Sequence, residues 1–98
     1  MIVEYRTKSL EKTCTQAKVA IRAYGQEMAI RLQQRIKQIQ STDTVEMLLQ
    51  FHIGRCHALH GDREGQYAMD LVHPYRLVFT RHGDVLQIAR IEEIVDYH

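Results

Sequence analysis

The chain has 98 residues, of which 45% are hydrophobic. This is enough for one domain over residues 1–98 that buries about 65% of the surface its unfolded chain would expose. Cys14 and Cys56 lie far apart without metal-ligand spacing, and no signal-peptide pattern opens the chain, so we expect a cytoplasmic protein. No apolar run approaches the roughly 20 residues that cross a bilayer, which excludes a membrane protein.

The formal net charge of +1 conceals an uneven distribution of charged residues. In residues 1–40 the basic side chains outnumber the acidic ones: Arg6, Lys8, Lys12, Lys18, Arg22, Arg31, Arg35 and Lys37 against Glu4, Glu11 and Glu27. A basic helical face is consistent with contact to nucleic acid, but an ordinary solvated helix surface has the same composition. This pattern alone therefore leaves both interpretations open.

Residues 2–6 are predicted to form a short strand, and two helices follow it. Apolar residues recur at spacings of three and four from Ser9 to Tyr24 and again from Met28 to Ile39, with Gly25 between the two runs. We therefore predict a helical hairpin that ends near Ser41. Residues 43–51 are expected to add a short helical turn, and the glycine-rich residues 52–65 are expected to form a loop.

The hydrophobic period shortens to two after residue 65. Apolar residues alternate with others in two runs, and a third apolar run covers 85–95 after a turn at 81–84. The prediction is an α+β fold: a strand, a helical hairpin and a three-stranded antiparallel meander, with the helices on one face. If Tyr75, Leu77 and Phe79 face the helices, Arg76 projects from the opposite face. It then needs either a ligand or an ion-pair partner such as Asp70 or Glu92.

The order of elements, with "CHALHGDREG", "HPYRLVF" and "DYH" in succession, resembles the RelE/ParE superfamily of bacterial toxins, in particular its HigB-like branch. The resemblance covers essentially the whole chain. It implies a ribosome-dependent endoribonuclease that cuts mRNA during translation. Its implied partners are the ribosome, mRNA, a cognate antitoxin with a helix-turn-helix domain and, through that antitoxin, operator DNA. The residues it implies as catalytic are His57, Arg76, Asp96, Tyr97 and His98, and those in contact with substrate are His60, Arg63 and Tyr75.

These residue types suit the cleavage of RNA without a metal or cofactor. The reaction needs a base for the ribose 2′-hydroxyl, a cation for the phosphorane and an acid for the departing 5′-oxygen. A histidine with a pKa of about 6.5 serves as base or acid near neutrality, so His57 and His98 suit the proton transfers. Arg76 suits the phosphate, Asp96 could orient an imidazole or act as base, and Tyr97 could stack on a base or donate to phosphate.

Other functions are also compatible with this sequence. "HALH" at 57–60 could be half of a zinc site, but the remaining candidate ligands are not at a recognised spacing. Relatives of the same fold inhibit DNA gyrase, and a binding module without enzymatic activity would also need no catalytic set. A net charge of +1 is low for a protein that docks on ribosomal RNA. Only the nuclease interpretation requires His57, Arg76, Asp96 and His98 to lie close together.

Overall fold

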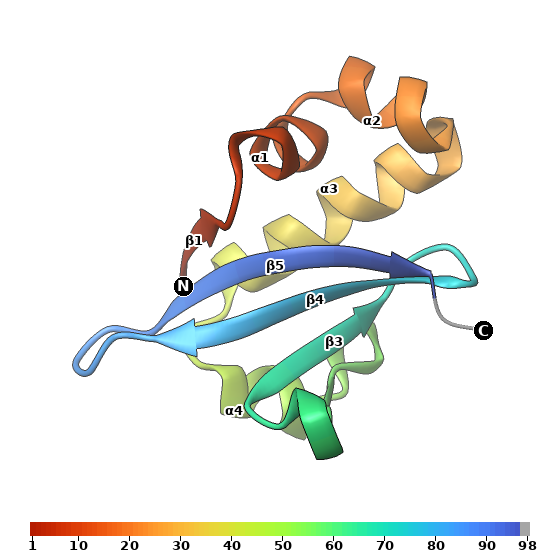
Figure 1. The fold of residues 1–98 in the computed structure, drawn as a ribbon. Coiled ribbons are helices and arrows are strands. Elements are labelled where there is room, and N and C mark those ends of the chain that lie inside the picture. Colours follow the sequence, from red (N-terminus) through yellow and green to blue (C-terminus); the bar gives the residue numbers. More distant parts are fainter. Residues whose placement is uncertain (97–98) are drawn as a thin grey trace.

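The computed structural model describes residues 1–96, which form an α+β fold with one five-stranded sheet (Figure 1). In chain order its elements are β1 (Ile2–Tyr5), α1 (Lys8–Thr15), α2 (Ala17–Tyr24), α3 (Gln26–Ser41), α4 (Val45–Gln50), the 3-10 helix η1 (Ile53–Arg55), β2 (His57–Ala58), the 3-10 helix η2 (Gly61–Arg63), β3 (Gln66–Asp70), β4 (Tyr75–His82) and β5 (Ile88–Asp96). No helix within residues 1–96 is long and apolar enough to span a membrane.

The helical half departs from a simple hairpin at one point. The predicted first helix is divided into α1 and α2 at Gln16, which has extended backbone angles (φ −118°, ψ 110°). Thr13 and Thr15 donate their hydroxyls to carbonyls four residues back, an arrangement that bends and weakens helices. Gly25 ends α2 with a φ of 92°, and α3 then runs to Ser41 as predicted.

The sheet has the strand order β1-β5-β4-β3-β2. Strands β3, β4 and β5 pair antiparallel in sequence, which confirms the predicted meander, and β1 adds to β5 in parallel. The prediction of a loop over 52–65 is wrong at His57–Ala58, because these residues form β2 and pair with β3. Two residues are too few for alternation to be detected. The last strand begins at Ile88 rather than Val85, which is 94% exposed in the turn.

The core lies between the helices and one face of the sheet. Leu77, Phe79 and Ile91 are fully buried there against residues of all four α-helices. The ring of Tyr67 stacks on Phe79 at a centroid distance of 5.6 Å. The alternate residues of β4, such as Arg76, therefore point to the other side of the sheet, which we call the open face. This confirms the direction predicted for Arg76.

Replacing Gly54 with alanine should destabilise the protein by about 2–4 kcal/mol, because it adds left-handed backbone strain to overpacking. Gly54 has a φ of 58°, and an added Cβ would lie 2.7 Å from Arg35 Nε and 2.9 Å from Met69 Cε. The matched control is Gly61→Ala, since Gly61 has a φ of 66° but no atom within 4 Å of the added Cβ. Urea unfolding should show a clearly larger loss for Gly54→Ala; equal losses would contradict the clash.

Candidate active site

A pocket of about 380 Å³ opens beside η1 and β2 at one end of the sheet. Its described lining residues are mostly cationic or titratable: His52, Arg55, Cys56, His57, Asp70 and Arg76. His57 and Arg76 thus line one concavity, as strand alternation and the loop before the meander predict. Their catalytic role stays a prediction.

His57 is fixed by its strand and by one hydrogen bond. Its pairing with Ala68 places the side chain on the open face, in a cross-strand row with Val78 and Glu93. The ring Nδ1 lies 3.0 Å from the carbonyl oxygen of Arg55. A carbonyl only accepts, so Nδ1 carries the hydrogen and donates. In the neutral ring Nε2 is therefore the unprotonated nitrogen, which is the form a general base requires.

Arg76 shares a carboxylate with a second arginine. Its Nε lies 3.5 Å from Asp70 Oδ1, while Arg55 Nε lies 3.2 Å from Asp70 Oδ2. A third arginine, Arg35, is buried beneath and donates from Nε to the Asp70 backbone carbonyl at 2.7 Å. The ion pair between Arg76 and Asp70 that the sequence left open is therefore present. Two guanidinium groups contact the Asp70 carboxylate and a third binds the backbone carbonyl of the same residue, so positive charge exceeds negative charge at the pocket.

Two small buried residues lie on the open face between these side chains. Ala68 and Val78 are paired directly across β3 and β4 and are both 0% exposed, although neither belongs to the core under the helices. Neighbouring side chains therefore cover both residues on the open face, and neither lines the pocket.

The structure places the carboxyl-terminal candidates differently from His57 and Arg76. Asp96 ends β5 and pairs with Tyr75, whose ring contacts Tyr24 of α2 edge to face at 5.2 Å. Cross-strand partners share a face, so Asp96 leaves the strand on the helical side, and it is not among the described residues that line the pocket. Tyr97 and His98 lie outside the described residues, and their roles stay predictions.

The three predicted substrate-contact residues occupy separate places. His60 is exposed just before η2. Arg63 donates from Nη1 to Glu93 Oε1 at 2.7 Å and to Gln66 Oε1 at 3.1 Å. Tyr75 lies on the helical face against Tyr24, as strand alternation predicts, and its contact with substrate stays a prediction. The pocket instead gains Arg55, which sequence analysis missed because it lies in an aperiodic segment.

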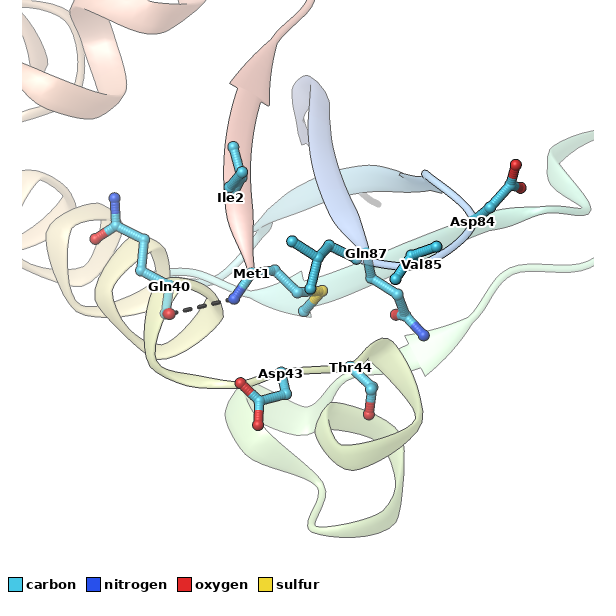
Figure 2. Close-up of a pocket in the computed structure, with 9 residues that line it drawn as sticks. Met1, Ile2, Gln40, Asp43, Thr44, Asp84, Val85 and Gln87 are labelled. Atoms are coloured by element: carbon cyan, nitrogen blue, oxygen red, sulfur yellow. Dashed lines mark hydrogen bonds between the residues drawn. The ribbon is translucent and has the colours of Figure 1, made fainter.

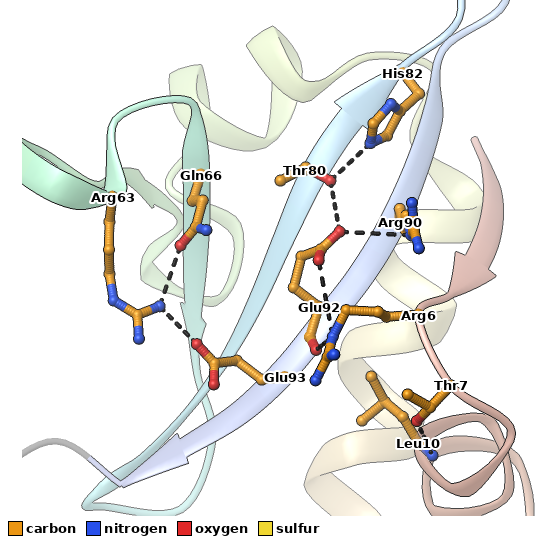
Figure 3. A network of polar contacts seen from close by, with 10 residues as sticks. All are labelled: Arg6, Thr7, Leu10, Arg63, Gln66, Thr80, His82, Arg90, Glu92 and Glu93. Atoms are coloured by element: carbon orange, nitrogen blue, oxygen red, sulfur yellow. Dashed lines mark hydrogen bonds and ion pairs between the residues drawn. The ribbon is translucent and has the colours of Figure 1, made fainter.

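A polar network covers the remainder of the open face (Figure 3). A β-bulge separates the Val78–Glu93 and Phe79–Ile91 pairs and leaves Glu92 unpaired in β5. Glu92 accepts a hydrogen bond from Thr80 at 2.9 Å and lies 3.6 Å from Arg90 Nε and 3.9 Å from Arg6 Nε. With Glu93 paired to Arg63, three arginines meet two carboxylates here. The pocket has the same excess of one positive charge, since Arg55 and Arg76 share Asp70, and it places this charge beside His57.

Cys56 lines the pocket but is unsuited to nucleophilic attack. Burial raises the pKa of its thiol to about 12, so the sulfur stays protonated near neutrality. Among residues 1–96, no group of three His, Cys, Asp or Glu side chains is arranged to hold a metal ion.

A larger hollow of about 630 Å³ lies at the other end of the sheet (Figure 2). Its described lining residues include no histidine, lysine or arginine side chain: Met1, Ile2, Gln40, Asp43, Thr44, Asp84, Val85, Leu86 and Gln87. Its charged groups are the carboxylates of Asp43 and Asp84, which would repel a phosphate, and the amino group of Met1, which already donates to the backbone carbonyls of Ile39, Gln40 and Thr42. The smaller pocket is therefore the better candidate for phosphate chemistry.

The mixed sheet with its helices on one face is a RelE-like α+β fold. A solved structure of similar fold is described as the YoeB/ParE toxin from Agrobacterium tumefaciens. It aligns over 100% of both chains with a TM-score of 0.69 and 14% sequence identity. At this identity the likeness shows the fold, and activity has to be argued from the site. No protein-family model and no curated protein sequence matches the chain.

Proposed function

We propose that the protein is a HigB-like toxin of a type II toxin–antitoxin system that cleaves mRNA on the ribosome. The observation that carries this proposal is the pocket in which His57, oriented through Nδ1, lies with Arg76 and Arg55. A base with a free Nε2 beside cationic groups is the minimum that metal-independent RNA cleavage requires. The full-length RelE-like fold supports the same conclusion.

In this proposal His57 Nε2 removes the proton of a ribose 2′-hydroxyl. The 2′-oxygen then attacks the adjacent phosphorus while the bond to the 5′-oxygen breaks. Arg76 stabilises the charge that develops on the non-bridging oxygens. Tyr97 or His98 donates a proton to the departing 5′-oxygen. The products are a 2′,3′-cyclic phosphate and a 5′-hydroxyl, and no oxidant, metal or cofactor takes part.

The test is to incubate the protein with ribosomes translating a defined mRNA and to map the new RNA ends. We expect cuts that depend on translation, with cyclic phosphate at the 3′ ends and hydroxyl at the 5′ ends. The cognate antitoxin, co-expressed with its helix-turn-helix domain, should suppress them. Intact mRNA after incubation with folded protein would refute the nuclease function.

A second candidate is a toxin that inhibits DNA gyrase, or a binding module without catalysis on the same fold. It is favoured by the placement of Asp96 on the helical side, away from His57 and Arg76. Such a protein would leave mRNA intact. A gyrase supercoiling assay separates its two forms, since only the toxin would block supercoiling.

A further inference from the structure

The backbone that carries Arg55 has an unusual conformation beside the pocket. Arg55 and His52 both have left-handed backbone angles, with φ of 56° and 52°, and Gly54 between them has a φ of 58°. Left-handed conformations are uncommon for residues other than glycine, and when surrounding structure imposes them they concentrate at functional sites. The turn directs both the carbonyl and the side chain of Arg55 toward the pocket.

Arg55 acts on the pocket through two different groups. Its carbonyl oxygen accepts the Nδ1–H of His57 at 3.0 Å, which determines the tautomer of that ring. Its Nε lies 3.2 Å from Asp70, the carboxylate that Arg76 also contacts through Nε. The side chain of Arg55 is 86% exposed, so its guanidinium is accessible to a ligand in the pocket.

Charge in the pocket favours an anion. Asp70 is the one acid among the described lining residues, and it lies among Arg55, Arg76 and the buried Arg35. Arg35 keeps its charge near neutrality although burial, with the nearby Arg31, lowers its pKa and Asp70 raises it. Two accessible guanidinium groups on either side of one carboxylate can also flank the tetrahedral oxygens of a phosphate.

We propose that Arg55 is a second phosphate-binding residue, which together with Arg76 holds the scissile phosphodiester of RNA, and that its carbonyl positions His57. The identity of the ligand as RNA rests on the proposed nuclease function. The geometry separates the two roles, because the guanidinium belongs to the side chain and the carbonyl to the backbone. One substitution can therefore remove the first and keep the second.

Arg55→Gly is that substitution, since glycine adopts a φ of 56° without strain and retains the carbonyl. The probe is inorganic phosphate, titrated by NMR against wild type, Arg55→Gly and the control Arg81→Ala. Arg81 is a surface arginine paired with Glu46 outside the pocket. We expect phosphate to shift signals of His57 and Arg76 in wild type, affinity to fall at least about fivefold in Arg55→Gly, and no change in the control. Unchanged affinity in Arg55→Gly would overturn the phosphate role.

The ¹⁵N shifts of the His57 ring test the positioning role. In the neutral form of the ring we expect the hydrogen on Nδ1 in both wild type and Arg55→Gly, and a hydrogen mainly on Nε2 would overturn this role. Phosphate binding is measured without ribosomes, so it separates this inference from the proposed function. If wild type leaves mRNA intact but binds phosphate through Arg55, the anion site stands and the nuclease function fails. If wild type cuts mRNA and Arg55→Gly cuts equally fast, the inference fails and the nuclease function stands.

Discussion

Replacing His57 with alanine should slow mRNA cleavage on translating ribosomes by roughly 10²–10⁴-fold, the contribution of a positioned general base. The hydrogen bond from Nδ1 to the Arg55 carbonyl leaves Nε2 as the basic nitrogen, and alanine removes it. Binding to the ribosome should persist, because the substitution removes one side chain at the edge of the fold. Single-turnover cleavage with excess toxin measures the chemical step, and co-sedimentation with ribosomes measures binding.

His82→Ala is the matched control for this experiment. His82 also lies on the open face, where its Nε2 is 2.8 Å from the Thr80 hydroxyl, but it is outside the pocket. Its loss should leave cleavage within about threefold of wild type, well below the effect of removing a catalytic base. If His57→Ala also stays within that range while wild type cuts mRNA, His57 is a pocket residue without a proton-transfer role.

The fold was predictable where the chain has a clear hydrophobic period. The alternation in β3 and β4 placed Leu77 and Phe79 in the core and Arg76 on the open face, and the structure confirms both. The division between α1 and α2 was not predicted, because the apolar spacing continues past Gln16 although the helical backbone is interrupted there. Strand β2 has two residues, which are assigned as a strand because they pair with β3. Neither feature has a local signal that periodicity detects.

The candidate site was predictable only in part. His57 and Arg76 came from the resemblance and from strand direction, and both line the pocket. Arg55 was missed because its position depends on left-handed backbone angles, which the pattern of residue types does not predict. Strand alternation also predicted that Tyr75 faces the helices, and its ring contacts Tyr24 of α2. That placement puts Tyr75 on the opposite face from Arg76, and its predicted contact with substrate is untested.

Local charge is more informative here than the net charge of the chain. A value of +1 argues against a protein that binds RNA everywhere on its surface. In the structure three arginines meet the carboxylates of Glu92 and Glu93, and Arg55 and Arg76 share the carboxylate of Asp70. Each group has an excess of one positive charge, and the pocket places its charge beside His57. The reacting phosphate is therefore expected to bind in the pocket, with ribosome docking dependent on additional contacts.

Arg76→Ala should reduce cleavage by about 10²–10³-fold, the cost of removing one preorganised group that stabilises transition-state charge. Because the Arg76–Asp70 pair is partly exposed, its loss should cost at most about 1 kcal/mol of stability. A lysine at 76 retains the charge but loses the planar fork, so Arg76→Lys should recover only part of the rate. Urea unfolding and single-turnover cleavage together separate the structural effect from the catalytic one.

The control for Arg76 is Arg90→Ala, because the two arginines are closely matched. Both lie in the sheet, their side chains are 37% and 42% exposed, and their Nε atoms are 3.5 and 3.6 Å from a carboxylate. They differ in position, since Arg76 lines the pocket with His57 and Arg90 lies in the network around Glu92. A loss of cleavage confined to Arg76→Ala would assign the effect to the pocket. Equal losses in both variants would instead indicate that the open face contributes general positive charge, and that Arg76 has no special part in the chemical step.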